Sequence, residues 1–251
     1  MAKILIFSKW NFDKTTCRIK DRVEKMIIEV VGSAGSGKST LAKALSERLD
    51  NARLELPPSI SKTENIPFFV RNTLGIFPIL PSIYLRRKGR YSPWYHFLFT
   101  VILNGWHKVL DQKTFKVNSI FILDQGPVYM ITFETLFGST MFESNISKKY
   151  WERTFYTWSK TLDLVIWLDA SLPVLVERIR KRETRHGIKG LYDMDAYRYL
   201  EAYHQAYDSV ISKLRINSNK LKVLPIDTGQ YSLEDTINII VNHLQQENHK
   251  V

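Results

Sequence analysis

The stretch Met26–Thr40 reads MIIEVVGSAGSGKST, and it decides the fold. Its first six residues form a short apolar, β-branched run, which predicts a buried strand. Gly32, Gly37, Lys38 and Ser39 then have the spacing of a phosphate-binding P-loop. Apolar residues recur beyond the loop at helical spacing, namely Leu41, Ala42, Leu45 and Leu49. Because the loop lies between a predicted strand and a predicted helix, a chance Gly/Ser turn is the weaker interpretation.

Each part of this loop has a chemical reason. Its glycines allow backbone N–H groups to approach phosphate oxygens closely, and the helix that follows presents its positive N-terminal end to the anion. Lys38 can reach the β- and γ-phosphates, and the Ser39 hydroxyl can bind Mg²⁺. We therefore expect the whole loop to hold a nucleotide, through Gly32, Ser33, Ala34, Gly35, Ser36, Gly37, Lys38, Ser39 and Thr40.

A second candidate site residue, Asp124, follows the apolar run Ser119–Leu123. A carboxylate at a strand end can hold Mg²⁺ through water, or it can accept a proton from a substrate hydroxyl. The sequence Asp-Gln-Gly-Pro is also good turn chemistry, so a purely structural turn is the alternative. With a P-loop in the same chain, we favour a catalytic or metal-binding role for Asp124.

The order of predicted elements indicates an α/β fold of three layers around a mostly parallel sheet. Two more apolar runs, Leu164–Leu168 and Lys222–Ile226, alternate with helical patterns, and such alternation produces parallel strands covered on both faces. Ligands of these folds bind at the carboxyl ends of the strands. Residues 26–251 form the P-loop domain in this interpretation, and residues 1–25 form an N-terminal extension in which Lys3–Phe7 could add an edge strand.

Composition and length narrow the class of protein further. The chain has 251 residues, and its single cysteine, Cys17, cannot form an internal disulfide. The longest apolar stretch, Trp94–Leu103, has half the length that a membrane-spanning helix needs. We expect a soluble, cytoplasmic protein. Six prolines in residues 57–93 predict turns and short helices there, before a helix near residues 94–110.

The net charge of +11 is concentrated in two segments, residues 84–116 and 178–190. In the second, Arg178 and Arg182 are four residues apart on one face of a predicted helix over 169–182, and Arg185 follows. Like charges so close together are unfavourable unless an anion neutralises them, and arginines suit the oxygens of a triphosphate. We interpret residues 178–190 as an arginine-bearing lid; a solvated face or a nucleic-acid patch is the alternative.

Taken together, these motifs resemble the thymidylate kinase-like group of P-loop kinases, which includes nucleoside monophosphate and deoxynucleoside kinases. The resemblance covers about residues 26–246. It implies a five-stranded parallel sheet, Mg·ATP as phosphoryl donor, and an acceptor site in residues 57–118. It also implies that Lys38 and Ser39 are the P-loop lysine and the metal-binding hydroxyl, that Arg178 and Arg182 are lid arginines, and that Asp124 is the strand-end acid. In thymidylate kinases an arginine that grips the acceptor's phosphate follows this acid, whereas Gln125 follows it here.

Two further hypotheses stay open beside a small-molecule kinase. The first is a nucleotide-binding regulatory ATPase or GTPase that has no small-molecule acceptor. The second is peripheral membrane contact through residues 84–110, where basic residues precede an aromatic helix; a core helix is the simpler interpretation. Nucleic-acid binding is disfavoured because no nucleic-acid motif accompanies the charge. A homodimer is compatible with the sequence.

Overall fold

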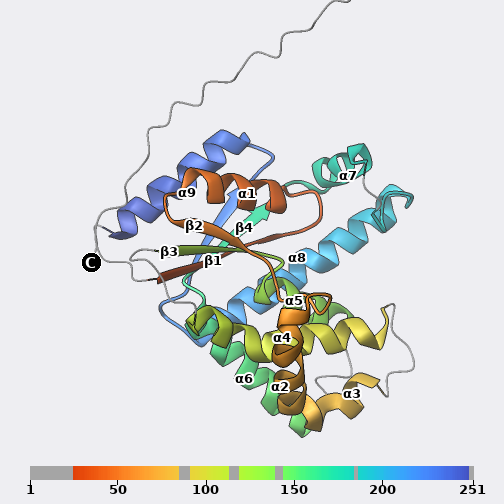
Figure 1. Cartoon of the computed structure of the whole chain (residues 1–251). Helices are drawn as coiled ribbons and strands as arrows, with labels where there is room; N and C mark the ends of the chain where they lie inside the picture. The colour runs from red at the N-terminus through yellow and green to blue at the C-terminus, as the bar shows by residue number, and fades with distance from the viewer. Residues whose placement is uncertain (1–24, 85–90, 113–118, 139–143, 184–185, 249–251) are drawn as a thin grey trace, which may run out of the picture.

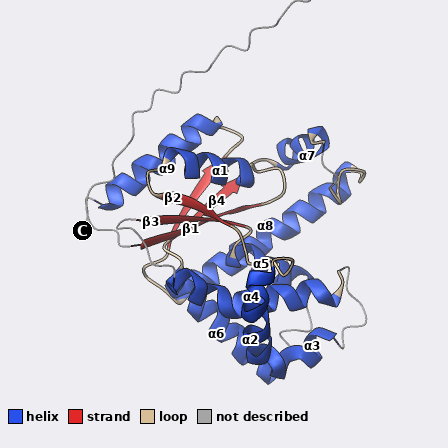
Figure 2. Ribbon diagram, viewed as in Figure 1, coloured by secondary structure: helices blue, strands red, loops and turns tan. Residues whose placement is uncertain are grey.

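In the computed structural model, the described residues are 25–84, 91–112, 119–138, 144–183 and 186–248. They contain one sheet of five parallel strands in the order β2-β3-β1-β4-β5 (Figures 1 and 2). The strands are β1 (Lys25–Gly32), β2 (Ala52–Glu55), β3 (Ser119–Asp124), β4 (Leu164–Asp169) and β5 (Lys222–Asp227). The predicted α/β fold with a five-stranded sheet is therefore confirmed, and every strand pair is parallel.

Four of these strands match the apolar runs of the sequence, and the fifth, β2, was missed. All residues of β3 and most residues of β1 are buried, because both strands lie inside the sheet. In contrast, β2 is four residues long, holds Arg53 and Glu55, and forms one edge of the sheet. Such a short strand has no apolar run to reveal it. The strand predicted at Lys3–Phe7 lies outside the described residues.

Helices cover both faces of the sheet (Figure 1). One face carries α1 (Lys38–Arg48) and α9 (Leu233–Asn248). The other face carries α4 (Pro93–Gln112), α5 (Pro127–Phe137), α6 (Asn145–Thr161) and α8 (Asp193–Ile216). Helix α7 (Leu172–Lys181) lies between β4 and α8 in the chain and packs on α8. Since all strands are parallel, the loops after β1, β3, β4 and β5 lie at one end of the sheet.

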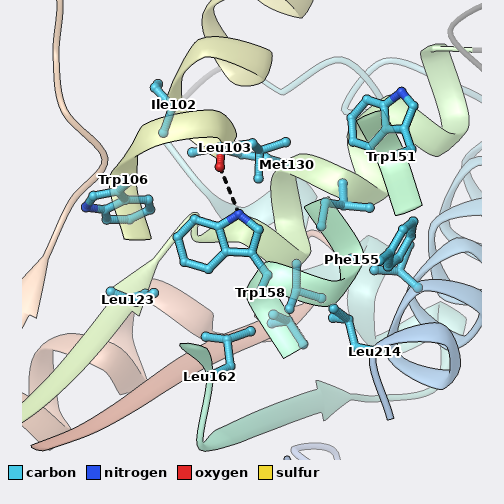
Figure 3. Packing of buried hydrophobic residues seen from close by; sticks show 14 of the residues in the cluster. Ile102, Leu103, Trp106, Leu123, Met130, Trp151, Phe155, Trp158, Leu162 and Leu214 are labelled. Carbon is cyan, nitrogen blue, oxygen red and sulfur yellow. Dashed lines mark hydrogen bonds between the residues drawn. The ribbon is translucent and has the colours of Figure 1, made fainter. Parts of the chain in front are cut away.

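The larger core lies between the sheet and the layer of α4, α5, α6 and α8. Trp106 and Trp158 pack edge to face there with ring centroids 6.2 Å apart, and the Trp158 indole N–H donates to the Leu103 carbonyl at 3.1 Å (Figure 3). His96 of α4 and Glu134 of α5 form a buried pair at 2.9 Å. The helix predicted near residues 94–110 is thus mainly a core helix, whereas the basic residues 86–90 that precede it lie outside the described residues.

The proline-rich segment folds into four consecutive helical pieces. They are η1 (Thr63–Asn65), α2 (Ile66–Ile76), η2 (Phe77–Ile79) and α3 (Leu80–Tyr84). Together, residues 63–84 are long and apolar enough to cross a membrane, judged by length and composition alone. Only 28% of the most apolar window of this run is buried inside the protein. This corrects the expectation that Trp94–Leu103 is the longest apolar stretch. The run packs on α4 through Phe69 and Ile76, among others.

Candidate active site

The P-loop joins β1 to α1 and has the backbone conformation that its glycines permit. Gly32, Gly35 and Gly37 have φ angles of 145°, 88° and 91°. At Gly32 a Cβ atom would lie 2.1 Å from the Leu168 carbonyl oxygen, so any side chain there would collide with β4. The loop therefore requires glycine for reasons of both conformation and space. Ser39 and Thr40 are exposed in the first turn of α1, as a phosphate or metal ligand must be.

Lys38 is folded back over this loop. Its ammonium group donates a hydrogen bond to the Ser33 carbonyl at 2.9 Å. Burial lowers the pKa of Lys38 to about 8; the nearby Asp124 carboxylate opposes this shift, and the nearby Arg182 guanidinium adds to it. A cation with a depressed pKa in a glycine-rich loop is poised for an anion that would restore the charged form.

Asp124 ends β3 beside β1 and contributes a carboxylate close to Lys38. The residue is buried, and its Oδ1 atom has no hydrogen-bond partner among the described residues. The next residue, Gln125, has a φ of 57°, which an L-residue adopts only under strain. An unpartnered carboxylate oxygen beside a P-loop lysine can accept a proton or help to hold a cation.

A second acid, Glu29, lies in β1 close to Asp124. It was not predicted from the sequence, because it stands within the apolar run of this strand. Its side chain is fully buried and accepts hydrogen bonds from the N–H groups of Val128 and Tyr129 at 2.9 and 3.0 Å. Burial raises the pKa of Glu29 to about 8, and the Asp124 charge adds to this effect. The only signal in the sequence was one charged residue among apolar ones.

The predicted lid arginines have different environments. The Arg178 guanidinium donates to the Thr228 hydroxyl at 2.9 Å and to the Thr228 carbonyl at 2.7 Å, so it is held by the loop after β5. The predicted helix over 169–182 begins at Leu172 and ends at Lys181. Arg182 is therefore an extended residue beyond the helix, not a fourth-position neighbour of Arg178 on a helical face. Arg185 lies outside the described residues.

Arg182 is exposed, and its charge acts on both Lys38 and His186. His186, which sequence analysis did not select, has a lowered pKa because of burial first and then because of the charges of Arg182 and Lys38. Three basic groups from the P-loop and the segment after α7 thus repel one another near the same point. Such an arrangement favours a polyanion in the space that they share.

A P-loop between strand and helix, with a strand-end carboxylate beside its lysine, defines the class of P-loop phosphotransferases. The family model of the deoxynucleoside kinases matches residues 28–248, so the chain belongs to the deoxynucleoside kinase family. Its reaction is phosphoryl transfer from a nucleoside triphosphate to a deoxynucleoside. Family membership decides between the open hypotheses in favour of a kinase over a regulatory ATPase or GTPase.

Two solved structures illustrate the likeness. The deoxyadenosine kinase from M. mycoides with dCMP and dCDP bound has a TM-score of 0.48 and 19% identity, and the match covers 88% of this chain and 100% of that one. The thymidylate kinase from Candida albicans has a TM-score of 0.52 and 15% identity, with 90% and 94% of the two chains covered. The second likeness supports the fold. Comparison with curated proteins finds no match.

Proposed function

We propose that the chain transfers the γ-phosphoryl group of Mg·ATP to the sugar hydroxyl of a deoxynucleoside, with Asp124 as general base. The observation that carries this proposal is the meeting of Lys38, Arg182 and Asp124 around the P-loop, where the Asp124 Oδ1 atom has no hydrogen-bond partner among the described residues. Phosphoryl transfer depends mainly on positioning and charge neutralisation, and these groups supply both.

In the proposed complex, the P-loop N–H groups and Lys38 hold the β- and γ-phosphates. Arg182 and His186 approach from the other side, where a protonated His186 would add a further cation. The Ser39 hydroxyl fits Mg²⁺, which prefers oxygen ligands and would bind through this protein group plus phosphate and water oxygens. When bound, the ion neutralises charge on the phosphates. The described residues form no group of three or more His, Cys, Asp or Glu side chains that could hold a metal by themselves.

The general base role follows from the acceptor being an alcohol. The acceptor oxygen forms a bond to the γ-phosphorus as the bond between that phosphorus and the bridging oxygen breaks, and ADP leaves. The hydroxyl proton passes to Asp124, whose Oδ1 atom has no other partner among the described residues. Glutamine instead of arginine after Asp124 is consistent with a nucleoside acceptor, because a nucleoside has no phosphate group that an arginine at position 125 would bind.

The region beside Asp124 suits a nucleobase. Tyr91, which precedes α4, lies 4.8 Å from Phe133 and 4.6 Å from Phe137 of α5, measured between ring centroids. Phe99 of α4 lies 6.1 Å from Tyr129, measured between ring centroids. Burial is the main reason that the pKa of Tyr129 is raised, and the nearby Tyr199 and Asp124 add to this effect. We propose that the acceptor base lies against these rings, because aromatic side chains stack well on bases. Of these rings, Tyr91 and Phe99 belong to residues 57–118, to which the resemblance assigns the acceptor site, whereas Tyr129, Phe133 and Phe137 belong to α5.

The test is ADP formation by the purified protein with Mg·ATP and each of the four common deoxynucleosides, with the corresponding monophosphates as comparison. We expect turnover with at least one deoxynucleoside and little with the monophosphates. Asp124→Asn should lower kcat at least a hundredfold with unchanged ATP affinity. Turnover with monophosphates alone, or wild-type kcat in Asp124→Asn, would refute the proposal. GTP in place of ATP tests the choice of donor.

A further inference from the structure

Glu29 contacts both the turn that follows Asp124 and the start of α5. It lies in the central strand β1, in register with Leu123 of β3 and Val165 of β4. Its side chain belongs to the same face as Ile27 and Val31, which is the face that α5 and α8 cover. A carboxyl group in a buried strand is costly unless it is fully hydrogen-bonded, so its partners indicate why it is there.

Those partners are the first free N–H groups of α5. The N-cap residue, Gly126, has no side chain to cap the helix, and Pro127 has no N–H. Val128 and Tyr129 are the next two residues, and both donate to Glu29, one to each carboxyl oxygen. Helix starts leave such N–H groups unsatisfied, and the side chain of the N-cap residue usually accepts from them. Here a residue of a distant strand serves instead.

The turn that carries Asp124 rests directly on this carboxyl group. A Cβ atom at Gly126 would lie 2.5 Å from the Glu29 carboxyl carbon, so the backbone approaches as closely as glycine permits. One residue earlier, Gln125 holds a positive φ of 57°. Strained backbone persists only where its surroundings fix it, and Glu29 fixes the residues that follow Gln125.

We propose that Glu29 is a positioning residue, which ties the Asp124–Gly126 turn and the start of α5 to β1 and thereby aims the Asp124 carboxylate at the acceptor hydroxyl. This inference rests on the proposed role of Asp124 as general base. It assigns Glu29 no contact with substrate. The ionisable groups near it among the described residues are Asp124 from β3 and Tyr207 from α8. The charge of Asp124 adds to the effect of burial on the Glu29 pKa, and the charge of Glu29 adds to the effect of burial on the Tyr207 pKa.

The test compares Glu29→Gln with the wild type and with a matched control, Thr132→Val. Glutamine keeps the size but has one acceptor oxygen, so one of the two N–H groups would face an amide NH₂ group. The Thr132 hydroxyl is buried in α5 and has no hydrogen-bond partner among the described residues, so Thr132→Val changes a polar group of the same helix without breaking a known contact. Readouts are ATP affinity, kcat, acceptor KM and hydrogen exchange of the Val128 and Tyr129 amides.

For Glu29→Gln we expect a tenfold or larger loss of kcat, less than threefold changes in ATP affinity and acceptor KM, and at least tenfold faster exchange of one or both amides. Thr132→Val should change none of these. In an Asp124→Asn background, Glu29→Gln should cost little more, because it acts through Asp124. Gly126→Ala, which pushes on the carboxyl group from the other side, should reproduce the kcat loss and provides a second variant if Glu29→Gln folds poorly.

The outcomes separate the two proposals. Wild-type kcat or unchanged amide exchange in Glu29→Gln, with Asp124→Asn still slow, overturns the positioning role alone. An equal loss of kcat from Glu29→Gln in the wild-type and Asp124→Asn backgrounds also overturns it. Wild-type kcat in Asp124→Asn overturns the general base role, and with it the reason for positioning.

Discussion

Nucleotide binding should draw a proton from solution at alkaline pH, because Lys38 is partly neutral when the P-loop is empty. With a pKa of about 8, only about a quarter of the Lys38 side chains carry a proton at pH 8.5. Triphosphate oxygens beside the ammonium group would favour its charged form and raise this pKa by several units. Binding at pH 8.5 should therefore take up about 0.7 of a proton per nucleotide, whereas at pH 6.5 the Lys38 contribution should be close to zero.

The assay is isothermal titration calorimetry of Mg·ATP binding without acceptor, repeated in buffers of different ionisation enthalpy. The slope of the observed binding enthalpy against the ionisation enthalpy of the buffer gives the number of protons taken up. Lys38→Arg is the control, because an arginine stays charged at this pH and should show no such uptake. Glu29 also has a pKa of about 8, so the Glu29→Gln protein removes any share that it contributes. Equal uptake by the wild type and Lys38→Arg would refute the reasoning, as would no uptake by the wild type.

Further predictions concern Arg178 and Arg182, the buried Glu29, and the buried pair of His96 and Glu134. Arg182→Ala should lower kcat at least tenfold with a smaller effect on ATP affinity, whereas Arg178→Ala should mainly release the loop after β5 and lower the melting temperature; the reverse pattern would contradict these assignments. Since burial raises the Glu29 pKa from 4.5 to about 8, the unfolded chain loses this proton first, and the free energy of unfolding should fall by about 5 kcal/mol between pH 4.5 and 8 on account of Glu29. Urea titrations at several pH values should show that this pH dependence of the free energy of unfolding is absent in Glu29→Gln. Glu134→Ala should lower the free energy of unfolding by about 1–3 kcal/mol, because it leaves the buried Nδ1 atom of His96 without its partner; no loss in the same titrations would show that the pair is not needed.

Sequence spacing was sufficient for those parts of the site that one local segment determines. The P-loop motif fixes a loop, a helix start and the place of Lys38, and Asp124 is marked by the end of an apolar strand. Glu29 escaped this reasoning because its role depends on Val128 and Tyr129, which reach it only once β1 and β3 pair.

The arginines predicted to form a lid show the opposite limit. Their spacing on a continuous helix brought Arg178 and Arg182 to one face, but α7 ends at Lys181 and the two side chains separate. The partner of Arg178, Thr228, follows β5, and only the pairing of β4 with β5 brings it within reach. Periodicity predicts which residues share a face of a helix; it predicts neither where the helix ends nor what that face meets.

The outer edge of β5 has a consequence for how the molecule behaves in concentrated solution. The N–H groups of Lys222 and Thr228 point inward to the carbonyls of Asp163 and Asp169, so by strand alternation the nitrogen of Pro225 points outward. β5 is one of the two edge strands of the described sheet, and a proline in its middle offers no N–H to an incoming strand and places a ring in its path. Strand addition is therefore hindered along the β5 edge, and replacing Pro225 with valine should make the protein more prone to aggregate.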